Sequence, residues 1–193
     1  CDLVSEQRVA QAEAEIRKML AKTGLAQAPI LPVSTVTGEG LDALRSHLDT
    51  TRRQLARRPA QGHFRLAVDR SFTLSGVGTV LTGTAMAGRV AVGDQLLVSP
   101  SGLEVRVRGI HAQNFPASEG LSGQRLALNM VGVEKAQVSR GDWILAKALH
   151  APTARLDVRL NLLPGEAKAL AHRTPVHLHL GAEDVNARVM LLE

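Results

Sequence analysis

An acid and a base stand side by side in a stretch that otherwise has the pattern of a plain β-strand. Phe64, Leu66 and Val68 alternate as in a strand with one buried face, and Asp69-Arg70 follows directly. A carboxylate beside a guanidinium could serve a charged ligand, because an arginine fork donates charge-assisted hydrogen bonds to anions. Neighbouring strand residues point to opposite faces, so Asp69 and Arg70 can converge only near a twist or a strand end. The alternative from these residues alone is a surface ion pair of little energetic value.

Short strands and glycine turns continue around this pair to about residue 149. Ser75–Gly78 contains two glycines, which give the backbone the freedom of a tight turn, and Thr79–Thr82 follows as the next strand. Further strands are predicted within 88–98, 103–108, 125–129 and 143–145. Several short strands in succession predict a closed or nearly closed β-barrel, because closure removes open sheet edges.

The N-terminal part has the pattern of an α/β domain instead. Ser5–Ala21 predicts an amphipathic helix, and Pro29–Val33 predicts a short buried strand. A second helix begins at Leu41 and continues to a run of arginines that ends at Arg58, where positive charge suits the helix dipole. One strand cannot form a sheet alone, so we expect the other strands of this domain before Cys1.

Two changes of pattern predict three domains. Pro59–His63 has the composition of a linker, and Ala151-Pro152 marks a second boundary. The predicted domains are residues 1–59, 60–150 and 151–193. The last of them predicts three more strands, at 154–162, 175–180 and 186–192. It is too short for an independent core, so we expect it to belong to a second barrel or to pack against the first.

Composition restricts how the core and the partners can be built. Of 193 residues, 45% are hydrophobic but only three are Phe, one is Trp and none is Tyr, so the cores must consist of Leu, Val, Ile and Ala. The formal net charge of +5 is compatible with a nucleic-acid or other phosphate-rich partner. The scarcity of aromatic residues argues against binding through base stacking.

The single Cys1 excludes an internal disulfide and is consistent with a reducing compartment. No apolar run approaches the roughly 20 residues that a membrane-spanning helix needs, and no signal peptide is visible. We therefore expect a cytoplasmic protein without a membrane partner. A first residue other than Met suggests a piece of a longer chain.

Two short motifs near the N-terminus resemble the guanine-binding elements of GTPases. Asp2 resembles the last residue of Asn-Lys-x-Asp, whose carboxylate accepts hydrogen bonds from the ring N–H and amino group of guanine. Ser34–Gly40, with the sequence STVTGEG, resembles the second guanine loop, although Thr35 replaces the usual small alanine. The resemblance assigns Asp2, Ser34 and Thr35 to a nucleotide site. An ordinary terminal acid and a plain connecting loop are the alternative.

Longer stretches of sequence carry a more specific family resemblance. The sequence FRLAVDRSFTLSGVGTVLTG from Phe64 to Gly83 is similar to the opening of the second domain of translational GTPases, and specifically of selenocysteine-specific elongation factors (SelB). HAQN at 111–114, GQRLALN at 123–129 and SRGDW at 139–143 are also similar. The resemblance implies a mainly β fold: a translation-factor second-domain β-barrel, preceded by the C-terminal α/β tail of a GTPase domain and followed by part of a second β-barrel.

The same resemblance implies a role for the charged pair. In such factors an acid, a base and a further arginine line the pocket for the aminoacyl group of tRNA, and the matching residues are Asp69, Arg70 and Arg125. A selenol is an anion at neutral pH whereas a serine hydroxyl is not, so two guanidiniums could select selenocysteine. The implied partners of the longer protein are selenocysteinyl-tRNA and the ribosome.

Several expected elements are absent from the sequence. It has no Gly-x-x-x-x-Gly-Lys-[Ser/Thr] phosphate loop and no Asp-x-x-Gly motif. We therefore expect GTP and magnesium to belong to the longer protein and none to bind this chain tightly, and we assign no catalytic residue. His177 and His179 share a strand face but have no third ligand nearby in sequence, so no metal site is expected. The resemblance places recognition of the messenger RNA hairpin in a C-terminal region outside this sequence.

Three other functions remain open from the sequence. The chain could come from another tRNA-carrying GTPase, such as a relative of elongation factor Tu or of an initiation factor. It could also come from a sulfate-activating GTPase subunit, which has the same barrels, or be a barrel without a ligand. A carrier of ordinary amino acids has no use for two pocket arginines, so cargo-binding assays with charged tRNA discriminate among these functions.

Overall fold

The computed structural model describes residues 1–54, 61–163 and 168–192. The described residues fall into two compact units, one within 1–56 and 158–169 and the other within 57–157 and 170–193. Each unit is described by itself below. The three predicted domains, 1–59, 60–150 and 151–193, stay predictions. Neither helix of the described chain is long and apolar enough to cross a membrane.

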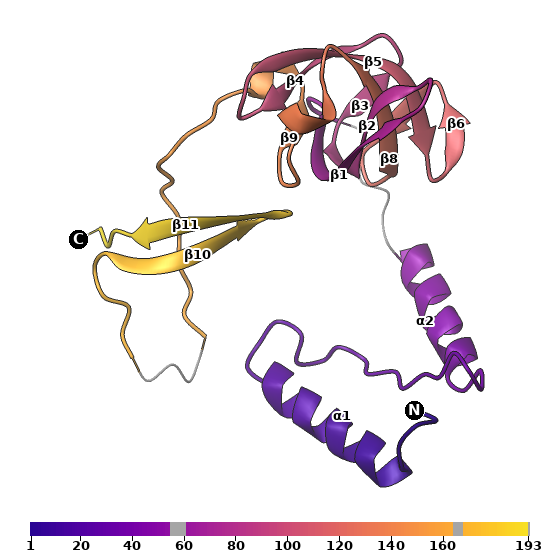
Figure 1. Ribbon diagram of the computed structural model, residues 1–193. Coiled ribbons are helices and arrows are strands. Elements are labelled where there is room, and N and C mark those ends of the chain that lie inside the picture. The colour runs from indigo at the N-terminus through magenta and orange to yellow at the C-terminus, as the bar shows by residue number, and fades with distance from the viewer. Residues whose placement is uncertain (55–60, 164–167, 193) are drawn as a thin grey trace. The chain divides into compact units, whose positions relative to one another are not determined.

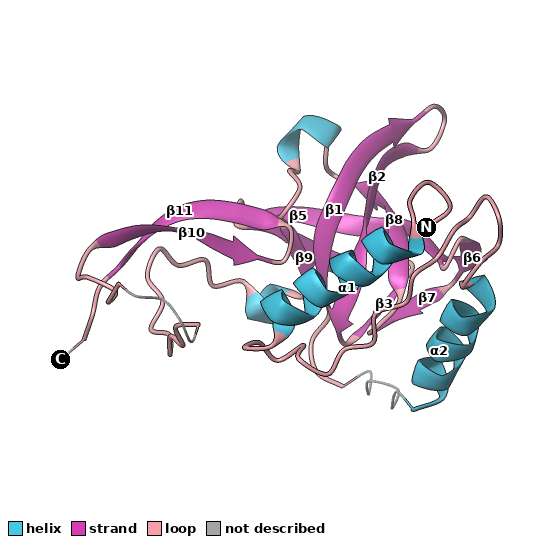
Figure 2. Ribbon diagram, turned by 90° about the horizontal axis from the view of Figure 1, so that it is seen from below, coloured by secondary structure: helices cyan, strands magenta, loops and turns pink. Residues whose placement is uncertain are grey.

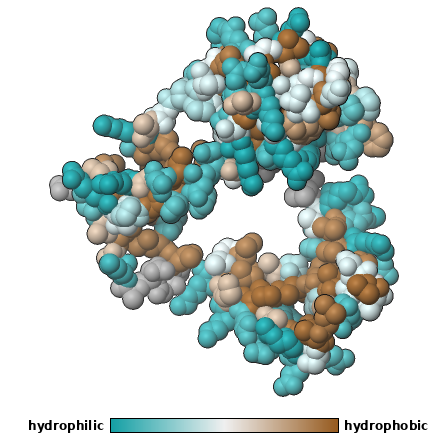
Figure 3. Space-filling model, viewed as in Figure 1, coloured by the Kyte–Doolittle hydropathy of each residue, from teal (hydrophilic) through white to brown (hydrophobic). Residues whose placement is uncertain are grey.

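The first unit contains both helices (Figure 1). Helix α1, Glu6–Leu20, begins after Ser5, whose hydroxyl accepts a hydrogen bond from the backbone N–H of Arg8 at 3.3 Å, as expected of an N-cap residue. Helix α2 is Leu41–Gln54. Both predicted helices are thus present, and the arginines at 57 and 58 lie outside the described residues. Neither helix has a buried residue, and apolar side chains are visible on the surface of this unit (Figure 3).

The predicted strand at 29–33 is wrong. These residues have no strand assignment, and they are exposed or only half-buried. The terminal ammonium of Cys1 donates a hydrogen bond to the carbonyl oxygen of Val33 at 3.1 Å, which ties this segment to the N-terminus. A strand requires a neighbouring strand for its ladder of hydrogen bonds, and no described residue forms one beside this segment.

The second unit is built on the predicted barrel (Figures 1 and 2). Its strands are β1 (Arg65–Leu74), β2 (Gly78–Ala87), β3 (Arg89–Ala91), β4 (Gln95–Ser99), β5 (Leu103–Ala112), β6 (Phe115–Ala117), β7 (Glu119–Leu121), β8 (Arg125–Val131) and β9 (Trp143–Leu145). The sheet order β4-β9-β1-β2-β8-β5 closes on itself through an added β4–β5 pairing, and β6 extends from β5. The protein is therefore mainly β, with a closed six-stranded barrel.

Inward-facing aliphatic side chains fill the barrel, as the composition predicts. Leu66, Leu81, Leu128 and Ile144 have no exposed surface, and each contributes about 1.5–3 kcal/mol by its burial. Phe64 is the one aromatic residue among the buried core positions of the described chain. The short strands β6 (FPA) and β7 (EGL) were not predicted, because each contains a Pro or a Gly and has no run of β-branched or large apolar residues.

The C-terminal part of the described chain forms fewer strands than predicted. Strands β10 (Thr174–Leu180) and β11 (Glu183–Val189) pair as an antiparallel hairpin and match two of the three predictions. The predicted strand at 154–162 is wrong, since the segment has no strand assignment despite alternating Leu156, Val158 and Leu160 with polar residues. The alternation is present here, but, as at 29–33, no described strand pairs with the segment.

Candidate functional site

An irregularity in β1 places the adjacent acid and base on one face of the sheet. Val68 pairs with Gly83 and Arg70 pairs with Thr82, so Asp69 is an extra residue that faces no partner. Such a β-bulge opposes two residues to one, and it interrupts the usual alternation of side chains. Val68 points into the core, whereas Asp69 bonds to the Thr82 hydroxyl and Arg70 shares the register position of Thr82.

Asp69 and Arg125 form a two-armed ion pair across β2. One arm is a very short contact from Nη1 of Arg125 to Oδ2 of Asp69, and the other joins Nη2 to Oδ1 at 3.0 Å. Thr82 lies between them: its hydroxyl donates to Oδ1 of Asp69 at 2.7 Å and accepts from Nη2 of Arg125 at 3.3 Å. The three side chains come from three neighbouring strands, β1, β2 and β8, and form one network on the outside of the barrel.

These contacts determine the charge state of the network. Hydrogen bonding from Arg125 lowers the pKa of Asp69 below its ordinary value, and the Thr82 hydroxyl and the charges of Arg125 and Arg70 act in the same direction, while burial opposes them. The hydrogen bond with Asp69 in turn raises the pKa of Arg125. The carboxylate of Asp69 therefore stays ionised at neutral pH, and Arg125 stays cationic.

Arg70 is placed near the network without joining it. Its side chain is exposed, and within the described residues it forms no hydrogen bond or ion pair. Its charge nevertheless contributes to the lowered pKa of Asp69, so the guanidinium lies close enough to act on the carboxylate. Of the three residues predicted from the sequence, the structure joins two directly and leaves the third as an uncompensated positive charge on the same face.

Thr82 is a residue of this network that sequence reasoning missed. It is only 9% exposed although it lies on an outward register position, because Asp69 and Arg125 cover it. The sequence carries a weak signal: Thr82 is a polar residue directly after the apolar pair Val80-Leu81, and its hydroxyl lies opposite the charged pair of the preceding strand. The bulge that brings the hydroxyl to the carboxylate has no comparable mark in the sequence.

Replacing Thr82 with valine is expected to raise the pKa of Asp69 toward its ordinary value. Valine has the same shape but no hydroxyl to donate to the carboxylate, and the barrel should lose about 1 kcal/mol of stability, typical of one hydrogen bond. Carboxyl NMR titration of Asp69 and urea denaturation measure the two effects. Thr82→Ser keeps the hydroxyl and should retain the lowered pKa. An unchanged Asp69 titration in Thr82→Val would show that the hydroxyl does not position the carboxylate.

The two guanine-type motifs meet in the first unit. The Ser34 hydroxyl donates to Oδ1 of Asp2 at 2.6 Å and accepts from the backbone N–H of Thr37 at 3.2 Å. Ser34 is buried, and its hydrogen bond is the largest cause of a lowered pKa of Asp2. The hydroxyl thus orients a carboxylate that is ionised at neutral pH. Thr35 is exposed beside this pair, and among described residues its side chain has no hydrogen bond.

The loop geometry depends on Gly40. Its φ is +72°, and a Cβ at this position would lie 2.1 Å from the carbonyl oxygen of Pro32. The loop is also closed by backbone hydrogen bonds from Ser34 to the carbonyl oxygen of Glu39 and from Gly38 to that of Ser34, both at 3.0 Å. A residue with a side chain could not replace Gly40 without moving the segment that carries Ser34.

Comparison with known proteins places this fold and these motifs in a family. The family model of elongation factor Tu domain 2 matches residues 78–145. The whole chain is 42% identical to the selenocysteine-specific elongation factor of Escherichia coli (strain K12) and 34% identical to that of Desulfomicrobium baculatum. In both cases the match covers 100% of this chain and 30% of the relative. The chain therefore spans less than a third of the length of these relatives.

Solved structures agree with the sequence relatives. The crystal structure of translation elongation factor SelB from Methanococcus maripaludis, in its apo form, matches with a TM-score of 0.79 at 28% identity, covering 97% of this chain and 42% of that one. A bacterial selenocysteine-specific elongation factor matches with the same TM-score at 27% identity, covering 98% of this chain and 31% of that one. Over the length that it spans, the chain belongs to the selenocysteine-specific elongation factor family of translational GTPases.

Proposed function

We propose that the outward face of the barrel at Asp69, Arg70 and Arg125 receives the selenocysteinyl group of a charged tRNA. The observation that carries this proposal is the Asp69–Arg125 ion pair, which the Thr82 hydroxyl supports and beside which Arg70 lies unpaired on the same face. One carboxylate and two guanidiniums leave a single excess positive charge. A selenolate would neutralise that charge, whereas a neutral serine hydroxyl would not.

The geometry supports different roles for the three residues. Asp69 holds Arg125 in place and keeps the empty site from being a bare cationic surface, while Arg70 is free to donate to an incoming anion. Each charge-assisted hydrogen bond to a selenolate contributes about 1.5–3 kcal/mol. At 1.4 kcal/mol for each factor of ten, one such bond suffices to prefer selenocysteine over serine by about tenfold or more.

We further propose that the first unit supplies the guanine contacts of a GTP-dependent elongation factor. Asp2, oriented by Ser34, would accept hydrogen bonds from guanine, and the backbone at Thr35 would face the guanine oxygen. GTP phosphates and magnesium would be held by other parts of the longer protein, which would deliver its cargo to the ribosome. In this proposal residues 1–59 belong to the GTPase domain, 60–150 form the second domain, and 151–193 begin the third.

Equilibrium binding tests the cargo assignment. A full-length factor that contains these residues, loaded with a non-hydrolysable GTP analogue, is titrated with selenocysteinyl-tRNA and with seryl-tRNA of the same tRNA body. The tRNA contacts are then identical, and only the side chain of the cargo differs. We expect at least about a tenfold preference for the selenocysteinyl form. Equal affinities would overturn the proposed site.

A further inference from the structure

The turn of the β10–β11 hairpin lies against the barrel, and both belong to the same compact unit. A Cβ on Gly181, in this turn, would lie 3.8 Å from Cζ2 of Trp143 and 3.9 Å from Cβ of Ala67, two residues that pair in register across β9 and β1. A Cβ on Gly141 would lie 2.8 Å from Cβ of Glu183 and 2.9 Å from its Cδ. The hairpin turn therefore contacts the barrel at two neighbouring points, the β1–β9 ladder and Gly141.

Gly141 is the point at which a hairpin side chain meets the backbone of the barrel. It is buried, and its φ of +101° lies in the left-handed region that favours glycine. The turn that carries it is closed by Asp142, whose carboxylate accepts a hydrogen bond from the backbone N–H of Ser139 at 2.8 Å. Because Gly141 has no side chain, Glu183 packs directly over the backbone of this turn. Close packing of this kind transmits a displacement from one segment to the other.

The same turn forms the last backbone hydrogen bonds that hold β1 on its β9 side. The N–H of Gly141 donates to the carbonyl oxygen of Val68, and the N–H of Val68 donates to that of Asp142, both at 2.9 Å. Within the described residues, no later residue of β1 has a register partner on this side. Asp69, the extra residue of the bulge, follows directly. The position of the turn therefore determines where β1 departs from regular pairing.

We propose that Glu183 is a positioning residue for Asp69, and that it acts by holding the turn at Gly141 against β1. A displaced turn would carry the start of the bulge with it and move the carboxylate away from Thr82 and Arg125, its two bonding partners. The hairpin thereby controls the cargo site from outside that site. The effect on cargo rests on the proposed function, whereas the effect on the Asp69 carboxylate is measured without tRNA.

Glu183→Ala tests the proposal, because it removes the side-chain atoms beyond Cβ that pack on Gly141. In the 193-residue chain, carboxyl NMR titration should show the pKa of Asp69 rising toward its ordinary value. Loss of a negative charge acts in the opposite direction, since a like charge nearby disfavours the ionised carboxylate. In the full-length factor loaded with a GTP analogue, the preference for selenocysteinyl-tRNA over seryl-tRNA should fall about 2–10-fold. An unchanged or lowered pKa of Asp69 would overturn the proposal.

Two variants of the hairpin separate packing from charge. Glu183→Gln keeps nearly the same shape without the charge, so it should not raise the pKa of Asp69. Asp184→Ala removes the same charge from the next residue, whose carboxylate lies 3.2 Å from Nδ1 of His177 and is exposed. If either variant raises the pKa of Asp69 as much as Glu183→Ala, packing on Gly141 is not the cause and the proposal is wrong.

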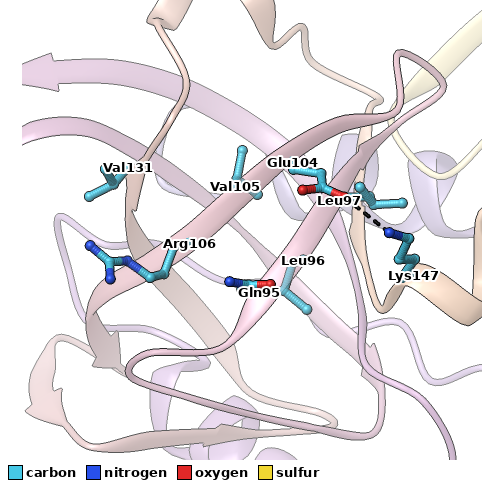
Figure 4. A pocket seen from close by; sticks show the side chains of 8 residues that line it. All are labelled: Gln95, Leu96, Leu97, Glu104, Val105, Arg106, Val131 and Lys147. Atoms are coloured by element: carbon cyan, nitrogen blue, oxygen red, sulfur yellow. Dashed lines mark hydrogen bonds and ion pairs between the residues drawn. The ribbon is translucent and has the colours of Figure 1, made fainter.

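A third control lies on the barrel, at a depression of about 280 Å³ that is lined mainly by β4 and β5 (Figure 4). There Glu104 pairs with Lys147 at 3.1 Å, and no residue of the hairpin lines the depression. Glu104→Ala removes an acidic side chain without touching the hairpin turn, so the native titration of Asp69 should remain. A rise equal to that in Glu183→Ala would show that the titration responds to any lost acid, and would contradict a specific role of Glu183.

Failure of this proposal is distinguishable from failure of the cargo site. If charge reversal at Arg125 removes the preference for selenocysteine while Glu183→Ala changes neither the preference nor the Asp69 titration, the cargo site stands and the positioning role is wrong. If charge reversal at Arg125 leaves the preference intact, the cargo site is wrong, and the Asp69 titration in Glu183→Ala still decides the positioning role.

Discussion

Reversing the charge at Arg125 is expected to remove the preference for selenocysteine. In Arg125→Glu the site has two carboxylates and one guanidinium, so a selenolate would meet a net negative charge in place of a positive one. Asp69 would also lose the partner that neutralises it. Because bonds to charged groups contribute about 1.5–3 kcal/mol, selenocysteinyl-tRNA should lose about 10–100-fold more affinity than seryl-tRNA. Titration of both charged tRNAs against the GTP-bound full-length factor measures the difference.

Two further variants separate the effect of the positive charge at residue 125 from the effect of its two-armed pairing with Asp69. Arg125→Lys keeps the positive charge but cannot form the two-armed pair with Asp69, so part of the preference should remain. Arg89→Glu reverses the charge of another exposed, ion-paired arginine elsewhere on the barrel, where it should affect both cargoes alike. Equal losses for the two tRNAs in Arg125→Glu would refute the proposed site, even if total binding falls.

The parts of the fold that could be predicted are those specified by local pattern. The Ser5 cap, both helices and the longer barrel strands follow from residue spacing that acts within one element. The two wrong strands, at 29–33 and 154–162, show the limit of local pattern, because neither a short apolar run nor an alternating segment supplies the partner strand that a ladder needs. Strand formation depends on another segment of chain in a way that helix formation does not.

The candidate site shows a similar limit. The sequence indicates Asp69 and Arg70 as candidate site residues by their charge, but strict alternation would place their side chains on opposite faces of the sheet. The bulge opposite Thr82 and Gly83 resolves this contradiction, and it depends on the register between two strands. Arg125 was assigned through family resemblance, since nothing in the spacing of the sequence places it across β2 from Asp69. The Thr82 hydroxyl was missed because its role exists only after the three strands are aligned.

The register at the bulge depends on Gly83, and Gly83→Ala is expected to have the largest effect on stability. A Cβ there would lie 2.0 Å from the carbonyl oxygen of Ala67 and 2.7 Å from Cδ2 of Leu66. The first of these is a backbone atom that cannot rotate away, so β1 and β2 would have to separate where Val68 pairs with Gly83. We expect a loss of about 3 kcal/mol in urea denaturation, at the upper end of typical overpacking costs.

Gly24→Ala is the matched control, because nothing lies within 4 Å of a Cβ at that position and its stability should change by less than about 0.5 kcal/mol. Gly83→Ala is also expected to alter the site. If the bulge is what brings Asp69 to Thr82 and Arg125, the variant should also raise the pKa of Asp69 toward its ordinary value under conditions where the barrel is still folded. A folded Gly83→Ala protein with the native Asp69 titration would show that the site does not depend on the bulge, and the one extra residue in β1 would then not explain the convergence of the charged side chains.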